Sequence, residues 1–320
     1  MFTDGLFEKV LVDPVAELDC DSLLSISGYA TSAMLEKHLQ VVDKLGKSIH
    51  LDLTIGMAKN DGIEAAHLGQ FRKFTTDGIY KSSGSCGIIS TGGPVHSKVF
   101  VWMREGKPQR AFAGSANYTL NGFRGHQGEA VGEVDAKLAW DYVNACKGNA
   151  TSCLDEYWDD RKTKRVFKSH KEIGVVRAVT APVLSGDREL ALSWLVKNTG
   201  ETPAKSGINW GQRDGRNRNQ AYIPVPAEVQ KTDFFPSRGE PFTVLTDDEQ
   251  VIVMVVAQEN GKALHSLPGN EIIGEYIRVR LGVSNGEYVT KEHFKAYGRS
   301  DLDFTKIDDE TFLLDFSVNA

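Results

Sequence analysis

The hydrophobic pattern of this chain changes once, between about residues 155 and 175, and this change constrains the fold more than any other feature. Before it, short apolar runs with strand periodicity alternate with segments that repeat at helical spacing. After it, short strand-like runs follow one another at intervals of about ten residues. The 320 residues are also about twice the length of an ordinary domain of roughly 150 residues. The sequence therefore predicts two domains, at residues 1–165 and 175–320.

The first region has the strand–helix alternation of an α/β domain. Strands are predicted at Leu23–Ser27 and at Ser48–Ile55, and helical spacing follows each of them, from Ala33 to Leu45 and from Gly62 to Phe74. Further elements are expected as strands at Gly87–Ser90, Lys98–Trp102 and Ala111–Gly114, and as a helix at Ala136–Ala145. Such units fold into a sheet covered by helices, so we expect a mixed sheet flanked by helices.

The second region consists of short β-type runs separated by turn signals such as Pro268-Gly269-Asn270 and Ser284-Asn285-Gly286. The expected strands are Leu190–Val196, Ala221–Val225, Phe242–Leu245, Val251–Val256, Glu275–Leu281 and Thr311–Phe316. This spacing predicts an all-β barrel or sandwich.

Several classes of protein are excluded by simple features of the chain. It has no run of 18 apolar residues, which argues against a transmembrane helix, and its first residues lack a basic segment followed by an apolar one, which argues against a secretory signal. Its four cysteines, at positions 20, 86, 146 and 153, contain no C-x-x-C pair, so we expect reduced thiols and no zinc site. These features indicate a cytoplasmic protein without a membrane partner.

One stretch carries recognisable chemistry. His96 and Lys98 are two residues apart in a predicted strand, so both side chains point to one face. An imidazole and an ammonium side by side suit a phosphate, because one can attack phosphorus while the other neutralises its oxygens. Ser115 and Asn117 follow a glycine turn and can converge on the same oxygens, and the carboxylate of Glu129 could hold the second ring nitrogen of His96.

In this order, H-x-K, G-S-x-N and a later Glu, the motif resembles that of the phospholipase D superfamily. The resemblance implies that His96 is the nucleophile, that Lys98 and Asn117 bind the phosphate, that Ser115 assists them, and that Glu129 supports His96. It implies neither a metal nor another cofactor, since the lysine takes the place of a divalent cation.

Two features qualify this resemblance. The superfamily often has an aspartate five residues after the lysine, but this chain has Met103, so no role is transferred to that position. A second H-x-K, His293-Phe294-Lys295, is not followed by G-S-x-N, and we do not assign it to catalysis.

The superfamily reaction uses two histidines on opposite sides of phosphorus. A chain with one motif thus resembles the members in which a homodimer builds one site from two subunits, although a degenerate, inactive site is the alternative.

The segment from Gly207 to Pro224 is dense in the side chains that make bidentate base contacts, Arg to guanine and Asn or Gln to adenine. A merely solvated polar loop is the alternative. This segment, with Asn209-Trp210-Gly211-Gln212 and the earlier Ser27-Gly28-Tyr29-Ala30, resembles the NgoFVII-type restriction endonucleases, which join a phospholipase D-like nuclease domain to a B3-like DNA-binding pseudobarrel. The candidates for contact with DNA are Gln212, Arg213, Arg216, Asn217, Arg218 and Gln220. A second recognition arm is expected among residues 284–286, 290–293 and Arg299.

The resemblance implies a dimeric, metal-independent restriction endonuclease that cuts double-stranded DNA at a specific sequence. The formal charge of −6 of this chain does not exclude binding to DNA, because a positively charged DNA-binding surface can be local. Related systems imply a companion ATPase and a cognate methyltransferase as possible partners. The alternatives are a lipid phosphodiesterase of the same superfamily, which should carry two H-x-K motifs, and a DNA-binding protein with an inactive nuclease domain.

Overall fold

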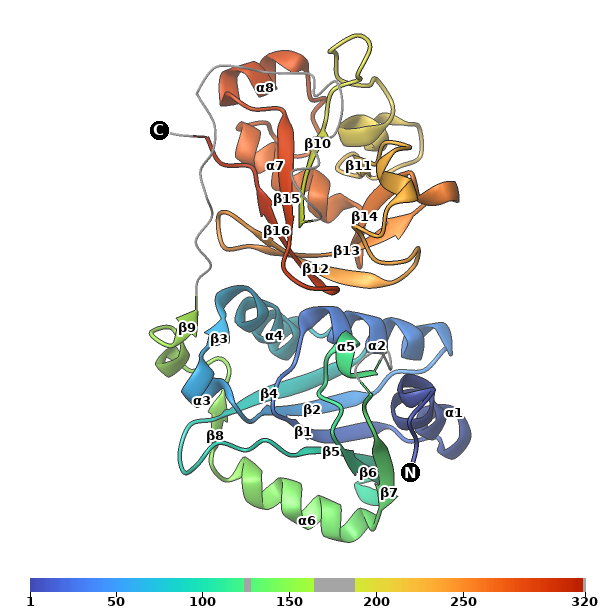
Figure 1. Ribbon diagram of the computed structural model, residues 1–320, viewed down its shortest axis with the longest axis vertical. Coiled ribbons are helices and arrows are strands. Elements are labelled where there is room, and N and C mark those ends of the chain that lie inside the picture. The colour runs from blue at the N-terminus through green and yellow to red at the C-terminus, as the bar shows by residue number, and fades with distance from the viewer. Residues whose placement is uncertain (124–127, 164–187, 319–320) are drawn as a thin grey trace. The chain divides into compact units, whose positions relative to one another are not determined.

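The computed structural model describes residues 1–123, 128–163 and 188–318. The chain divides into two compact units, Met1–Lys164 and Arg165–Ala320 (Figure 1). Each unit has a seven-stranded sheet and a separate hydrophobic core. We describe each unit by itself.

The N-terminal unit is built on a mixed sheet with the strand order β7-β6-β5-β1-β2-β4-β8. Strands β1, β2 and β4 are parallel, and the other pairs in this sheet are antiparallel. The strands are β1 (Ser22–Ser27), β2 (His50–Ile55), β4 (Ser83–Ile89), β5 (Lys98–Arg104), β6 (Lys107–Gly114), β7 (Val131–Val134) and β8 (Ala150–Ser152). A separate parallel pair consists of β3 (Ile63–Glu64) and β9 (Lys162–Thr163).

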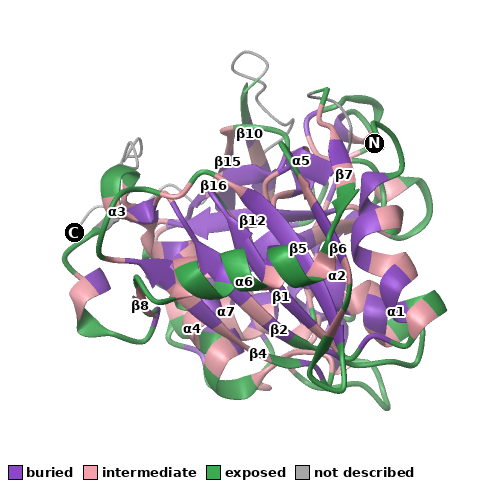
Figure 2. Ribbon diagram, turned by 90° about the horizontal axis from the view of Figure 1, so that it is seen from below, coloured by how far each residue is buried: buried purple, intermediate pink, exposed green. Residues whose placement is uncertain are grey.

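Helices cover both faces of this sheet (Figure 1). Helices α2 (Ser32–Lys44) and α4 (Ala65–Asp77) lie on one face, and α6 (Ala136–Lys147) lies on the other. The smaller helical elements are a π-helix at Glu8–Val12, α1 (Asp13–Leu18), α3 (Ala58–Asp61), α5 (Leu120–Phe123) and a 3₁₀ turn at Glu156–Trp158. Strand β5 is buried on both faces, which explains its continuous apolar run and its buried colour in Figure 2. The expected mixed, helix-flanked sheet is confirmed.

The C-terminal unit has a sheet with the order β10-β15-β16-β12-β13-β14-β11, which curls into a half-barrel. Only β12 and β16 pair in parallel among the ladders of this sheet in the described residues. The strands are β10 (Glu189–Ser193), β11 (Ile223–Pro224), β12 (Pro241–Thr246), β13 (Val251–Ala257), β14 (Ala263–Leu267), β15 (Asp301–Lys306) and β16 (Thr311–Asp315). Short 3₁₀ segments lie at Gly207–Gln212, Val229–Lys231 and Glu259–Gly261.

The expectation that this unit is all-β is wrong in one respect, because it contains helices α7 (Glu271–Leu281) and α8 (Lys291–Tyr297). The predicted strand at Glu275–Leu281 is the second half of α7. A strand would bury Val279 and expose Arg278, whereas the helix exposes 70 % of Val279 and buries Arg278 completely. The arginine is stable there because its guanidinium reaches four backbone carbonyl groups, a compensation that a local pattern does not reveal.

Candidate active site

The predicted catalytic motif lies where β5 begins and β6 ends. These two strands are antiparallel, and Lys98 pairs with Gly114, so the H-x-K and G-S-x-N segments meet although the sequence separates them. On the other side of β5, Val99 pairs with Ile26, which brings the end of β1 to the same edge. The sheet thus brings His96, Lys98, Ser115 and Asn117 together.

His96 and Lys98 form the centre of the site. The ammonium Nζ of Lys98 lies 3.1 Å from Nε2 and 3.2 Å from Nδ1 of the His96 ring. Lys98 is only 5 % exposed, whereas His96 lies at the surface. Burial lowers the pKa of Lys98, and the nearby charge of Glu129 opposes this shift. The pair presents an accessible imidazole in front of a cation that has lost most of its water.

Asn117 lies beside this pair and is held by the end of β1. Its Oδ1 accepts a hydrogen bond from the backbone N–H of Tyr29 at 3.1 Å and lies 3.4 Å from the hydroxyl of Ser27. No hydrogen bond within the described part of the chain uses its Nδ2. An amide held by its oxygen has two N–H donors left, and these suit a phosphate oxygen.

Ser115 and Glu129 interact directly with each other. The hydroxyl of Ser115 donates a hydrogen bond to Oε2 of Glu129 and accepts one from the backbone N–H of Ala130 at 3.0 Å. The sequence analysis predicted that the carboxylate of Glu129 binds the second ring nitrogen of His96. In the structure this carboxylate accepts the hydrogen bond of Ser115, and its charge raises the pKa of Lys98. The support of His96 by Glu129 stays a prediction.

Two glycines that the sequence did not single out for catalysis allow the close packing of the site. A Cβ on Gly28 would lie 3.0 Å from Cδ2 of His96 and 3.1 Å from Oδ1 of Asn117. A Cβ on Gly56 would lie 1.8 Å from the carbonyl oxygen of Val95, so only glycine lets the segment before His96 approach β2. The signal available in the sequence was a glycine directly after each of two apolar strands.

The arginines predicted to contact DNA lie on an exposed loop that follows the 3₁₀ segment Gly207–Gln212. The guanidinium of Arg216 stacks on the ring of Trp210 at 3.9 Å and donates to Oε1 of Gln220 at 2.9 Å. Arg218 donates to Oε1 of Gln212 at 2.8 Å. The two glutamines therefore orient the arginines, and Gln212 also donates to the backbone carbonyl group of Gly286.

The remaining loop candidates make local contacts. Nε of Arg213 donates to the carbonyl oxygen of Lys205 at 2.7 Å, and Oδ1 of Asn217 accepts from the backbone N–H of Asn219 at 2.9 Å. Both candidates are exposed. Their contacts leave further polar atoms on the surface of the loop.

Buried polar residues tie the 3₁₀ segment Gly207–Gln212 to residues 287–289, which lie between the segments 284–286 and 290–293 proposed for the second arm. Arg278 donates to the carbonyl groups of Ile208 and Glu287, one in each segment. Asn209, completely buried, exchanges two hydrogen bonds with the backbone of Val289. The two segments therefore form one continuous edge of the C-terminal unit, and no local pattern in the sequence indicates these links.

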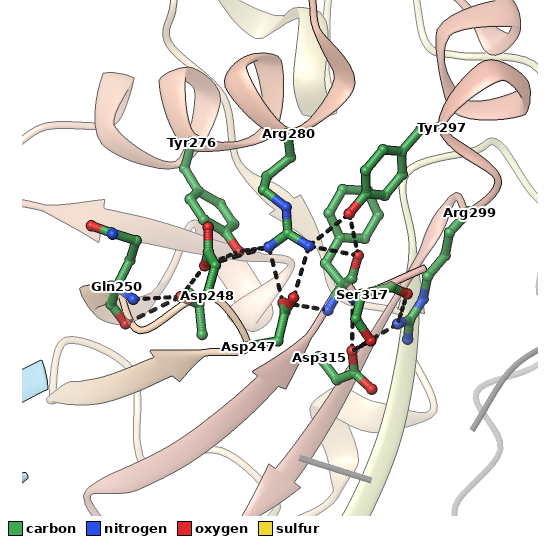
Figure 3. A network of polar contacts seen from close by, with 11 residues as sticks. Asp247, Asp248, Gln250, Tyr276, Arg280, Tyr297, Arg299, Asp315 and Ser317 are labelled. Atoms are coloured by element: carbon green, nitrogen blue, oxygen red, sulfur yellow. Dashed lines mark hydrogen bonds and ion pairs between the residues drawn. The ribbon is translucent and has the colours of Figure 1, made fainter. Parts of the chain in front are cut away.

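Arg299 was a further candidate for the second arm, and the structure contradicts it. The side chain is 4 % exposed and pairs with Asp303 at 2.8 Å. It also pairs with Asp315 at 3.0 Å, within the polar network of Figure 3. His293 accepts the N–H of Thr290 and completes a capping box at the start of α8, so the second H-x-K has a structural role.

Across 1–123, 128–163 and 188–318, no three His, Cys, Asp or Glu side chains gather in a way that could hold a metal ion. Within the same ranges, every helix is too short or too polar to cross a bilayer. The four cysteines are free thiols.

Comparisons with known proteins match both units. The family model of the NgoFVII restriction endonuclease N-terminal PLD domain matches residues 5–158, and the model of the NgoFVII C-terminal B3-like DNA-binding domain matches residues 184–308. Among solved structures, NucT from Helicobacter pylori aligns with a TM-score of 0.31 and 15 % sequence identity over 45 % of this chain and 91 % of that chain. No curated protein matches the chain.

Proposed function

Because this chain belongs to the family of NgoFVII restriction endonucleases, we propose that it hydrolyses phosphodiester bonds of double-stranded DNA at a specific sequence. The family joins a phospholipase D-type nuclease domain to a B3-like DNA-binding domain. The observation that carries the proposal is the exposed His96 ring within 3.2 Å of the buried Lys98 ammonium. This arrangement suits attack on a phosphate whose charge the lysine neutralises.

The reaction has two displacement steps. A ring nitrogen of His96 attacks phosphorus and forms a P–N bond, while the bond from phosphorus to the leaving oxygen breaks and a second histidine protonates that oxygen. Water then attacks the phosphohistidine and gives a proton to the second histidine, and the P–N bond breaks. Lys98 and Nδ2 of Asn117 stabilise the charge on the non-bridging oxygens in both steps, and Ser115 assists them.

The second histidine comes from a second copy of the chain. The chain has one H-x-K segment that is followed by G-S-x-N, and the histidine of the other H-x-K, His293, caps helix α8. We infer a homodimer with a twofold axis through the site, where His96 of the partner subunit is the general acid. One shared site then cuts the two strands one after the other.

Lys98 supplies the positive charge that many nucleases take from a divalent cation, so the proposed reaction is metal-independent and uses no cofactor. The exposed loop with Arg216 and Arg218 reads bases in the major groove, together with Gln212, Arg213, Asn217 and Gln220. We place the activity in the cytoplasm, which the free thiols support. A companion ATPase and a protective methyltransferase are further proposed partners.

Cleavage of supercoiled plasmid and phage DNA in EDTA tests the proposal. We expect defined fragments from the wild-type protein and a loss of about three orders of magnitude or more in His96→Ala, because no other group replaces the nucleophile. The matched control is His50→Ala, which removes another exposed histidine whose ring contacts Ser83. Sequencing of the fragment ends reports the site.

Other results would reject the proposal in distinguishable ways. Specific DNA binding without cleavage by the wild-type protein would indicate an inactive nuclease domain. Hydrolysis of phospholipid vesicles without cleavage of DNA would indicate a lipid phosphodiesterase. Cleavage by His96→Ala at the wild-type rate would remove the catalytic assignment, and loss of wild-type cleavage in EDTA would remove metal independence.

A further inference from the structure

The segment Ser27-Gly28-Tyr29, at the end of β1, contacts Asn117 and His96 without belonging to the catalytic motif. The hydroxyl of Ser27 donates to the carbonyl oxygen of Tyr29 at 2.6 Å and accepts the backbone N–H of Tyr118 at 2.8 Å. The segment is thereby fixed to the residue next to Asn117. Ser27 and Gly28 are buried, so solvent does not compete for these contacts.

This segment decides which way the amide of Asn117 faces. Oδ1 accepts the N–H of Tyr29 at 3.1 Å, and the hydroxyl of Ser27, whose proton goes to the carbonyl oxygen of Tyr29, lies 3.4 Å away. A flipped amide would put its N–H₂ group against the N–H of Tyr29, and two donors would face each other. The network therefore turns Nδ2 away from β1, to the side where a phosphate would be bound.

Gly28 leaves just enough room for this arrangement. A Cβ at this position would meet Cδ2 of His96 at 3.0 Å and Oδ1 of Asn117 at 3.1 Å, both closer than ordinary van der Waals contact. The backbone of Gly28 is not in the left-handed region, so an alanine there would act through these two contacts and not through backbone strain. One added methyl group would displace both catalytic side chains by a few tenths of an ångström.

Tyr29 supports the nucleophile from the side. Its ring meets the His96 ring edge-on, with centroids 6.2 Å apart and planes at 79°. Its hydroxyl donates to Oδ2 of Asp61 at 2.5 Å, which holds the ring in place although 41 % of the residue is exposed. Asp61 is the last residue of helix α3.

We propose that Ser27-Gly28-Tyr29 is a positioning element, in which the segment fixes Asn117 with its nitrogen toward the phosphate and Tyr29, held by Asp61, restricts the ring of His96. This inference rests on the nuclease function proposed above. It assigns these residues a role in geometry and none in contact with the reacting atoms.

Single-turnover cleavage by the full-length protein, measured beside DNA affinity, tests the inference. We expect Gly28→Ala to slow cleavage about tenfold with DNA affinity unchanged, because small displacements of catalytic groups are costly. The matched control is Gly132→Ala in β7, where a Cβ meets nothing within 4 Å, and it should cleave at the wild-type rate. Tyr29→Ala should slow cleavage about tenfold and Tyr29→Phe about twofold, since phenylalanine keeps the ring.

The ring resonances of His96 in NMR spectra, assigned from their loss in His96→Ala, provide a second readout. They should shift in Tyr29→Ala and stay in place in Gly132→Ala. If Gly28→Ala does not fold, the Tyr29 variants decide, because their side chain lies at the surface. Wild-type rates in Gly28→Ala and Tyr29→Ala, while His96→Ala is inactive, would overturn the inference and leave the proposed function intact. An inactive wild-type protein would instead overturn the proposed function.

Discussion

Lys98 in the N-terminal unit and Arg280 in the C-terminal unit are both largely removed from solvent, but only Arg280 is paired with a carboxylate. Arg280 in α7 makes a bidentate pair with Asp247, at 2.8 and 3.0 Å, and also donates to the hydroxyls of Tyr276 and Tyr297 and to the carbonyl oxygen of Phe316 (Figure 3). Lys98 contacts the ring of His96, which carries no formal negative charge when neutral.

The pKa values of the two groups follow this difference. Burial lowers the pKa of Lys98, and the charge of Glu129 compensates only in part. Burial alone would also lower the pKa of Arg280, but its hydrogen bond to Asp247 and the surrounding charges raise it above its usual range. Removal of a cation that is fully paired leaves its buried carboxylate without a partner and destabilises the fold, whereas a buried cation without a carboxylate partner is available to a bound anion. The difference predicts that one residue serves stability and the other activity.

The largest expected effect is on stability, in Arg280→Met. The change leaves Asp247 without its cation, and its side chain is only 9 % exposed, so the free energy of unfolding should fall by about 3–5 kcal/mol. Urea denaturation measures this, with Arg238→Met, an exposed arginine, as control. Adding Asp247→Asn should recover part of the loss, because the uncompensated charge is gone. An unchanged midpoint in Arg280→Met would break the comparison.

The second effect is on activity, in Lys98→Met. We expect cleavage to fall about 10²- to 10³-fold, since a charge preorganised for the phosphate is lost, without a loss of stability, since a charged group no longer has to be desolvated. The control is Lys295→Met, the lysine of the other H-x-K, which lies at the surface. If Lys98→Met unfolds more readily than the wild-type protein, then Lys98 is structural and the distinction from Arg280 fails.

The smallest effect is on the pH dependence of cleavage. Lys98 must be protonated to neutralise phosphate, so the rate should fall as pH rises through its lowered pKa, below the ordinary value for lysine. Glu129→Gln removes the charge that raises this pKa, and we expect the alkaline limb of the profile to move to lower pH. Glu133→Gln, an exposed residue of β7, should leave the limb in place. A limb that moves to higher pH would contradict the assigned charge interaction.

The longer helices and the central strands of the N-terminal unit could be predicted, because each has one dominant periodicity, whereas β7, β8 and the helical stretch at residues 8–18 were not predicted. The expected strands at Leu23–Ser27 and Lys98–Trp102 lie within β1 and β5, and the helix expected from Ala33 to Leu45 overlaps α2. The structure of residues 275–281 could not be predicted. The alternation of Ile277, Val279 and Leu281 indicates a strand, but the segment is helical because buried Arg278 finds carbonyl acceptors in distant segments.

The candidate site shows the same division. The residue types and order of the H-x-K and G-S-x-N segments were sufficient to expect a phosphate site, and the structure brings His96, Lys98, Ser115 and Asn117 together. The contributions of Gly28 and Tyr29 could not be expected, since they depend on β1 lying beside β5. The same limit applies to Arg299, whose aspartate partners lie on β15 and β16.

By itself the sequence determined the two-part organisation of the chain, the family and the order of the H-x-K and G-S-x-N segments, because these depend on local pattern and on residue identity. Only the tertiary structure decided which cations are saturated, which way Asn117 faces and which loop segments share one edge. Those properties depend on distances between strands and on competition for hydrogen-bond partners far apart in the chain. The physical reason is that a buried polar group has lost its water, so its charge and hydrogen bonds depend on the protein groups within its reach.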